Sequence, residues 1–158
     1  MEKISTTEPD WSREYCTTFW QPSKQLLRAI RGYQRAQAST GFIATLRAKW
    51  WVFCHRFWSV ICACDIPINC QIGGGLLLTH PVGVVIHPDA IIGPNCLILQ
   101  NTTIVGGVVL GGHVDIGAGA KIIAPVAIGD DARIGANAVV TKPVAAGTTV
   151  VGIPARVI

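Results

Sequence analysis

Large aliphatic residues recur at every sixth position through the middle of the chain, beginning at Ile92 and ending at Val140. The positions between them are Ile98, Ile104, Leu110, Ile116, Ile122, Ile128 and Ile134. A period of six fits neither a helix of 3.6 residues per turn nor a strand with simple alternation. It is typical of a parallel β-helix, in which three short strands make one coil and the coils stack. The pattern therefore predicts a mainly β chain with a repeat of eighteen residues.

The ladder continues towards the N-terminus with one irregularity. Its earlier members are Ile66, Ile72, Leu78 and Val84. Eight residues instead of six separate Val84 from Ile92, so we expect the chain to bulge within that interval. Residues 65–158 are then expected to form a β-helix of four to five coils, preceded by a helical region over residues 1–64.

Two amphipathic helices are predicted before the first coil. Pro22 and Ser23 precede a run with apolar residues at helical spacing, which predicts a helix that is capped by the serine and closes near Gly41. A second helix is expected from about Phe42 to Cys64. Its broad apolar stripe comprises Phe42, Ile43, Leu46, Trp50, Phe53, Phe57 and Ile61.

Two roles remain open for this apolar stripe. Its aromatic side chains either cover the open end of the first coil, or they lay the helix on a membrane surface, where tryptophan and arginine act together. We favour the first role, and a peripheral membrane contact is the less favoured alternative. The stretch is too short to span a bilayer, and it contains His55 and Arg56.

Basic residues are concentrated before the predicted β-helix. Nine of the thirteen lysines and arginines lie there, and no acidic residue falls between Tyr15 and Cys64. Arg28, Arg31 and Arg35 have the spacing of one helix side, and no nucleic-acid-binding motif accompanies them. We therefore expect a solvated helix face or a contact with a phosphorylated ligand, and no nucleic-acid partner.

The start of the chain and its cysteines indicate the compartment. Glu2, Glu8 and Asp10 interrupt any signal peptide, so we expect a cytoplasmic protein. Cys70 and Cys96 fall on inward-facing rows of small residues, which favours free buried thiols over disulfides. The cysteine and histidine spacings match no zinc pattern, and we expect no metal.

One histidine, His80, directly follows Leu78-Thr79 at the edge of the irregular segment, where a bulge can form one wall of a cleft. In an eighteen-residue coil, Asp65 stacks beneath Gly83, three residues past His80, and adjacent coils lie about 4.8 Å apart. The carboxylate can then hold one ring nitrogen while the other takes a proton as a general base. The alternative is a polar pair that caps the first coil.

Six segments of the chain carry a resemblance to a known family. They are Asp65-Ile66-Pro67-Ile68, Ile72-Gly73-Gly74-Gly75, Leu78-Thr79-His80, Leu97-Ile98-Leu99-Gln100, Ile116-Gly117-Ala118-Gly119-Ala120-Lys121-Ile122 and Val151-Gly152-Ile153-Pro154-Ala155-Arg156-Val157-Ile158. Together they resemble the serine O-acetyltransferase family of left-handed β-helix acyltransferases over nearly all of residues 65–158. The resemblance implies a trimer of left-handed β-helices that binds acetyl-CoA in the groove between neighbouring coils. We therefore expect an acetyl-CoA-dependent O-acetyltransferase.

The resemblance also assigns roles to individual residues. By position, His80 matches the catalytic base and Asp65 its carboxylate partner. The residues assigned to acetyl-CoA are Gly106, Gly107, Ala118, Ala136, Lys142 and Arg156. The glycine pair falls where backbone groups approach the thioester, and the alanines, one coil apart, match small residues that line the pantetheine channel. The two basic residues are candidate partners for the nucleotide phosphates, and a solvated surface role is the alternative for each.

The chain departs from the family pattern at the acceptor site. Family members usually carry a longer glycine-rich loop that ends in Arg-His-Pro, whereas this chain passes from Gly107 directly into Val108-Val109-Leu110. The acidic residue that the family places before the catalytic histidine is Thr79 here. Both departures remove charged contacts expected for serine, so serine stays the first expected acceptor by resemblance and a sugar hydroxyl is the close alternative. Thr79 and Asn101 are the candidate side chains for binding a neutral acceptor.

The resemblance bears on partners as well. The family's larger N-terminal domain joins two trimers, and only about sixty-five residues precede the solenoid here, so we expect a lone homotrimer. The tail by which the family docks to cysteine synthase is absent after Ile158, and we do not expect that complex. The remaining alternative is a non-enzymatic β-helical assembly module. It is less favoured because His80, His87 and His113 do not align as metal ligands.

Overall fold

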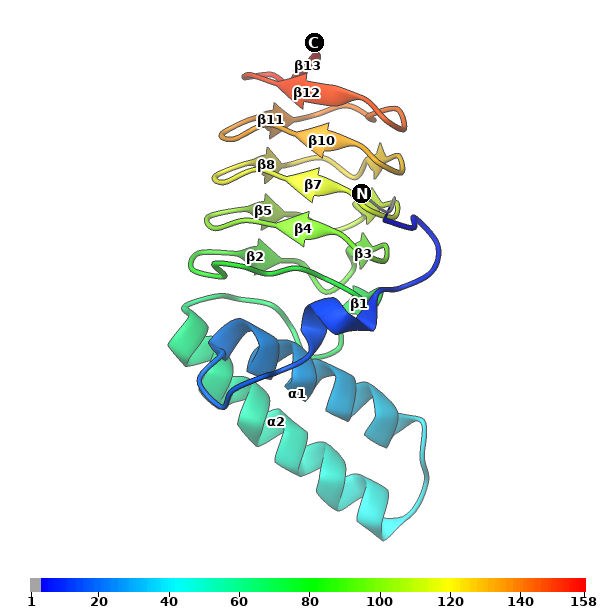
Figure 1. Ribbon diagram of the computed structural model, residues 1–158, viewed down its shortest axis with the longest axis vertical. Helices are drawn as coiled ribbons and strands as arrows, with labels where there is room; N and C mark the ends of the chain where they lie inside the picture. The colour runs from blue at the N-terminus through cyan, green and yellow to red at the C-terminus, as the bar shows by residue number, and fades with distance from the viewer. Residues whose placement is uncertain (1–3) are drawn as a thin grey trace.

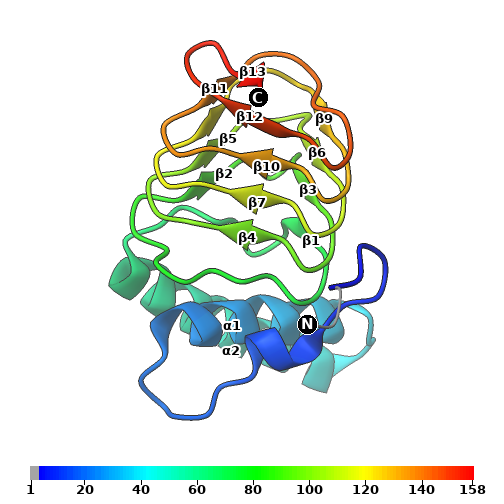
Figure 2. The same ribbon diagram turned by 45° about the horizontal axis from the view of Figure 1, so that its top comes forward.

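The computed structural model describes residues 4–158, which form a stack of β-coils standing on two helices (Figure 1). The predicted parallel β-helix with a helical N-terminal region is confirmed. Successive coils contribute short strands to three parallel sheets, which form the three walls of the solenoid (Figure 2). The core runs as one column through the centre of the coils.

Each wall is built from strands of two or three residues. The first sheet contains β1 (Gln71–Ile72), β3 (Ile91–Ile92), β6 (Val109–Leu110) and β9 (Ala127–Ile128). The second contains β4 (Leu97–Ile98), β7 (Asp115–Ile116), β10 (Arg133–Ile134), β12 (Thr149–Val151) and β13 (Arg156–Val157). The third contains β2 (Val85–Ile86), β5 (Thr103–Ile104), β8 (Lys121–Ile122) and β11 (Val139–Val140).

The six-residue ladder supplies the inward side chain of each strand. Ile98, Ile104, Leu110, Ile116 and Ile122 are essentially inaccessible to solvent, while the preceding residue of each strand faces outward. Because adjacent strands pair residue for residue, equivalent side chains stack directly on one another. The hydrophobic effect of burying this column is the main force that holds the coils together.

Two coils depart from the eighteen-residue repeat. Asp65 pairs with Val85, twenty residues later, so the first coil carries two extra residues. The prediction that Val84 is a rung was wrong, because Ile86 occupies that place and the extra residues lie between Leu78 and Ile86. The last coil is shorter, since β10 pairs with β12 at a separation of sixteen residues.

Helix α1 (Pro22–Gln37) closes the bottom of the solenoid. Leu26, Leu27 and Ile30 are fully buried and join the core of the first coil. The predicted serine cap was wrong: Gln21 is the N-cap, without a side-chain hydrogen bond, and the helix begins at Pro22, where the missing N–H costs nothing.

Helix α2 (Phe42–Cys62) packs beside α1 and shares little of its own surface with the core. Gly32 of α1 leaves room for the Trp51 indole, since a side chain there would overlap the ring. Trp58 and Cys62 are buried, and His55 Nε2 lies 2.8 Å from the Ile66 carbonyl oxygen of the first coil. The prediction that the aromatic stripe covers the first coil was therefore wrong for most of its members, because α1 has that role. Within residues 4–158, no helix is long and apolar enough to cross a membrane.

Residues 4–14, hereafter the strap, run along the coils and end in the 3-10 helix η1 (Trp11–Glu14). The buried Asn95 side chain holds the strap by donating to the carbonyls of Ser5 and Glu8 and accepting from the backbone N–H of Asp10, at 2.7–2.8 Å. This anchoring was not predicted from the sequence.

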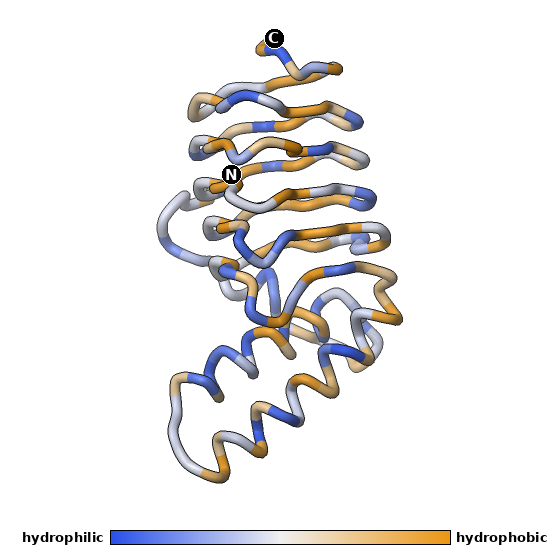
Figure 3. Tube along the Cα trace, turned by 180° about the vertical axis from the view of Figure 1, so that it is seen from behind, coloured by the Kyte–Doolittle hydropathy of each residue, from blue (hydrophilic) through white to orange (hydrophobic). Residues whose placement is uncertain are grey.

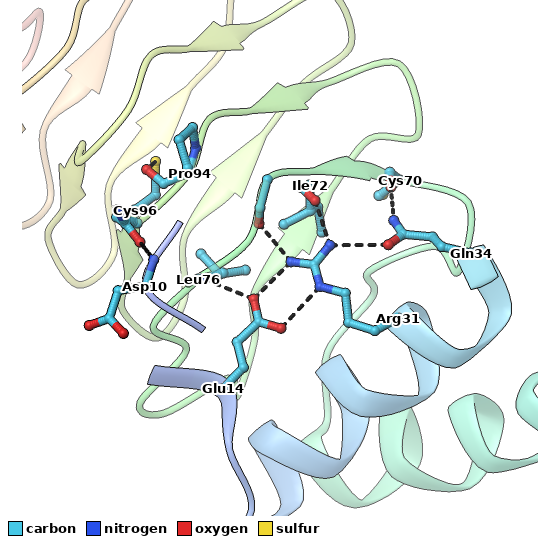
Figure 4. Close-up of polar contacts among 11 residues, drawn as sticks. Asp10, Glu14, Arg31, Gln34, Cys70, Ile72, Leu76, Pro94 and Cys96 are labelled. Atoms are coloured by element: carbon cyan, nitrogen blue, oxygen red, sulfur yellow. Dashed lines mark hydrogen bonds and ion pairs between the residues drawn. The ribbon is translucent and has the colours of Figure 1, made fainter. Parts of the chain in front are cut away.

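A buried ion pair joins the strap to α1 and the first coil (Figure 4). The Arg31 guanidinium binds both carboxylate oxygens of Glu14, at 2.8 and 3.0 Å, and also donates to the Gly73 carbonyl. Glu14 accepts in addition from the backbone N–H of Leu76. Satisfying both charges with backbone partners as well as with each other makes their burial tolerable.

Candidate functional site

Three corners connect the walls, and they contain the candidate site residues. The corner between the second and third sheets, here the His80 corner, comprises residues 79–84, 99–102, 117–120 and 135–138. The glycine corner, between the third and first sheets, comprises residues 87–90, 105–108, 123–126 and 141–143. The strap corner, between the first and second sheets, comprises residues 73–76, 93–96, 111–114 and 129–132.

His80 lies in the two-residue bulge at the bottom of the His80 corner. Thr79 and His80 are exposed, whereas Pro81 is buried and fixes the bulge against the coil. The bulge closes where the Gly83 N–H donates to the Ala63 carbonyl, at 2.8 Å. The imidazole makes no hydrogen bond to any residue in the range 4–158, so both ring nitrogens are open to an incoming molecule.

Asp65 lies at the lower edge of the third sheet. The expected stacking beneath Gly83 was wrong, because the longer first coil places Asp65 opposite Val85. Its carboxylate is exposed, and no hydrogen bond or ion pair joins it to His80 within the described chain. Burial, and secondly the negative charge of Asp65, raise the pKa of the Cys70 thiol to about 11.

The upper coils place three further candidates in register above the bulge. The Asn101 N–H donates to the Val82 carbonyl, and the Asn137 N–H donates to the Ala118 carbonyl one coil above Asn101. Ala136 precedes Asn137 in the same column. The corner thus brings together Thr79, His80, Asn101, Ala118 and Ala136 along one edge of the solenoid.

A single basic side chain reinforces this edge. Lys121 Nζ donates to the Asn101 carbonyl and, at 3.1 Å, to Thr103 Oγ1. Its three donors are therefore partly used in holding the corner backbone, which fixes the orientation of Asn101. Above the bulge, the His80 corner contains no charged residue, and its upper turns, 117–120 and 135–138, contain only glycine, alanine and Asn137.

Gly106 and Gly107 lie on the glycine corner, at the opposite end of the third sheet from His80. Gly107 is exposed and has φ of +76°, a conformation that favours glycine. The chain enters β6 at Val109 with no loop between. Within one chain, the structure does not bring these glycines together with the His80 corner.

The imidazole of His87, a residue with no role predicted from the sequence, packs over Gly106. A Cβ on Gly106 would lie 2.8 Å from His87 Nδ1. The same nitrogen accepts from the backbone N–H of Asp89 at 3.2 Å. The contact follows from the regular register of these two coils, in which Val85 pairs with Thr103 and His87 therefore lies next to Gly106.

Lys142 and Arg156 line one small cavity of about 260 Å³ near the top of the solenoid. Its other walls come from β11, β12 and β13. Two cations at one cavity, with no carboxylate among its lining residues, suit an anionic group.

A histidine–carboxylate pair does occur, on a different corner. His113 Nδ1 lies 2.7 Å from Asp131 Oδ1 on the strap corner. Both have positive φ and turn their coils. The pair lies away from the His80 corner, across the second sheet.

This chain is similar in sequence to hexapeptide-repeat proteins and to serine acetyltransferases. Residues 89–124, 113–142 and 125–151 match a family described as the hexapeptide repeat of succinyl-transferase. Serine acetyltransferase from Synechococcus elongatus is 40% identical over 103 residues, which cover 60% of this chain and 42% of that protein. The enzyme from Escherichia coli (strain K12) is 38% identical over 115 residues, covering 68% of this chain and 42% of the relative.

Solved structures of serine acetyltransferases share the fold of this chain. Soybean serine acetyltransferase complexed with serine superposes with a TM-score of 0.72 and 33% identity, covering 88% of this chain and 58% of that one. A serine acetyltransferase in complex with CoA superposes with a TM-score of 0.73 and 29% identity, covering 88% of this chain and 57% of that one. This chain therefore spans less than two thirds of the length of these relatives.

Proposed function

We propose that this chain transfers an acetyl group from acetyl-CoA to an acceptor hydroxyl, because it matches a hexapeptide-repeat model and is similar in sequence and fold to serine acetyltransferases. The observation that carries the proposal is the exposed His80 on its bulge, below a column of small residues that leaves space for a narrow substrate arm. A serine acetyltransferase of the same fold is known in complex with CoA, which supports the choice of donor.

In the proposed mechanism, His80 acts as general base. One ring nitrogen takes the proton of the acceptor hydroxyl as the oxygen attacks the thioester carbonyl. The tetrahedral intermediate then expels the CoA thiolate, which receives the proton back from the imidazolium. Asp65 would orient the ring and stabilise its charged form, with the carboxylate closing on the bulge when substrates bind.

The remaining candidates would hold the donor. Ala118 and Ala136 would leave room for the pantetheine arm at the His80 corner, while Lys142 and Arg156 would bind phosphates at their shared cavity. Gly106 and Gly107 would approach the thioester from the glycine corner. Since that corner is distant from His80 within one chain, we propose a homotrimer in which neighbouring subunits complete each site.

Serine is the first candidate acceptor, because relatives are named for it and one is known in complex with serine. A sugar hydroxyl is the second. It is favoured by the direct passage from Gly107 to β6 and by the neutral Thr79 and Asn101 beside His80, which offer no charged partner for an amino acid. Each charge-assisted hydrogen bond missing from the site would weaken serine binding by about 1.5–3 kcal/mol.

The test is a comparison of acceptors. Purified protein is incubated with saturating acetyl-CoA and either serine or a panel of sugars, and CoA release gives the specificity constant for each. We expect transfer to a hydroxyl, with a specificity constant for serine well below that of the related serine acetyltransferases. Selective and efficient acetylation of serine would remove the sugar alternative, and no transfer to any hydroxyl would overturn the proposed function.

A further inference from the structure

Helix α2 exposes a continuous apolar face on the single chain. Its members are Phe42, Ile43, Leu46, Trp50, Phe53, Phe57, Val60 and Ile61. Trp50 and Phe53, near its centre, are 59% and 63% exposed. The opposite face, with Ala44, Trp58 and Cys62, is the buried one, so the two faces are distinct. Figure 3 shows apolar positions recurring along the helices below the coils.

The loop before α1 extends this face. Phe19 and Trp20 are exposed, and their rings contact Trp58 edge-on, with centroids 5.9 and 5.8 Å away. Phe57 of α2 contacts Trp58 from another side, at 5.0 Å. Two separate segments therefore contribute aromatic rings to one surface, here called the α2 face. Contiguous exposed apolar patches of this kind mark interaction surfaces.

Basic residues border the α2 face on both sides. At about 100° per residue, Arg47 falls on one edge of the apolar stripe, and Lys49 and Arg56 fall on the other. All three are exposed, and no acidic residue occurs between Tyr15 and Cys64. Long cationic side chains at the edges of an apolar stripe suit an interface where the stripe enters a hydrocarbon layer and the charges meet anionic headgroups.

We propose that the α2 face is a peripheral binding surface for an anionic lipid bilayer. The helix would lie in the plane of the membrane with Trp50, Phe53 and Phe57 at the level of the headgroups, and the coils would stand above it. The charge pattern decides against pairing with a second copy, because two such faces would bring six cations together with no carboxylate to balance them. This reverses the preference drawn from the sequence, where α2 rather than α1 was expected to cover the coil.

Vesicle flotation of the full chain tests the proposal. We expect binding to phosphatidylcholine vesicles containing one third phosphatidylglycerol, weaker binding to pure phosphatidylcholine, and a loss of this difference at high salt. Replacing Arg47, Lys49 and Arg56 by glutamine should lower binding to the anionic vesicles by roughly a hundredfold. Absent flotation, or equal binding to both vesicle types, would overturn the proposal.

The apolar contribution is tested by a matched pair of variants. Phe53→Ser should weaken binding roughly tenfold, the effect of removing one large buried side chain. Ile158→Ser, at an exposed position on the far end of the solenoid, should leave binding unchanged. If Phe53→Ser instead lowers the molar mass in solution and the wild-type protein does not float, the face binds a second copy and the proposal is wrong. Acetyl transfer to a soluble acceptor is independent of either outcome.

Discussion

His80 projects from the only coil that carries two extra residues among those described, and its ring is not held by the chain around it. As the proposed base, His80 would take its orientation from its substrates and from Asp65. The bulge thus places His80 outside the regular repeat of the solenoid.

Replacing His80 by alanine is expected to lower the rate of acetyl transfer by roughly 10²–10⁴-fold, the usual contribution of a general base. Acetyl-CoA binding, measured by calorimetry, should be unchanged. Asp65→Asn should cost less, because it alters the orientation of the ring and not the base itself. Near wild-type turnover by the His80 variant with its preferred acceptor would exclude the assigned role.

The buried thiols are expected to make the free energy of unfolding depend on pH. Burial raises the pKa of Cys70 and of Cys96 from 9.0 to about 11 each. The folded chain therefore keeps two protons that the unfolded chain loses, and the free energy of unfolding should fall as the pH rises from about 9 to about 11. Urea denaturation under reducing conditions measures this fall. The Cys70→Ala, Cys96→Ala double variant should show a smaller one, and an identical decline would contradict the explanation.

Individual rung residues were predictable because each must fill the same space in every coil. The sequence could not show whether Val84 or Ile86 is the rung, since both are buried aliphatic residues two positions apart. Only the pairing of Asp65 with Val85 in the structure identifies Ile86 as the rung. The same two-residue shift moved Asp65 away from its expected neighbour. Local pattern cannot locate an insertion within a segment whose residues all suit the core.

The strap shows what periodicity misses at the scale of an element. Residues 4–14 have no repeating pattern, and their first part, from Ser5 to Asp10, is held by one asparagine in the left-handed region, Asn95, with φ of +61°. An asparagine that turns a corner and one that also anchors a distant segment are identical in sequence. The apolar spacing of α1, by contrast, predicted its buried side. Leu26, Leu27 and Ile30 lie on one face of the helix, and large aliphatic side chains on one face are buried against the core.

Asn95→Ala is expected to lower the free energy of unfolding by about 2–4 kcal/mol, since it leaves strap groups without partners in a buried site. Asn137→Ala is the matched control. Asn137 has φ of +56° but makes no side-chain hydrogen bond within residues 4–158, so its loss should cost only about 1–2 kcal/mol for the backbone conformation. Equal losses for the two variants in urea denaturation would mean that the hydrogen bonds from Asn95 to the strap contribute nothing to stability.

At the scale of the whole molecule, the outer face of the first sheet is the most apolar of the three walls. Ile91 and Val109 are 40% and 43% exposed there, beside Ala127. We expect this wall to contribute to the homotrimer, and Val109→Glu to reduce the molar mass from that of a trimer to that of a monomer in light scattering. A wild-type monomer at micromolar concentration would contradict the trimer, and with it the shared active site.

The segment 152–157 turns back on the top coil, and this reversal limits how the solenoid can grow. β13 pairs antiparallel with β12, while Gly152 and Ala155 bond to the backbone of Val139 at the edge of the third sheet. An incoming copy that stacked coil on coil would need parallel edges, and two of the three are already occupied in a pattern it cannot match. Helix α1 closes the lower end. A repeat that could in principle elongate into a fibre is thereby kept to a unit of fixed height, and Arg156, within that closing turn, becomes available to a ligand instead of a neighbour.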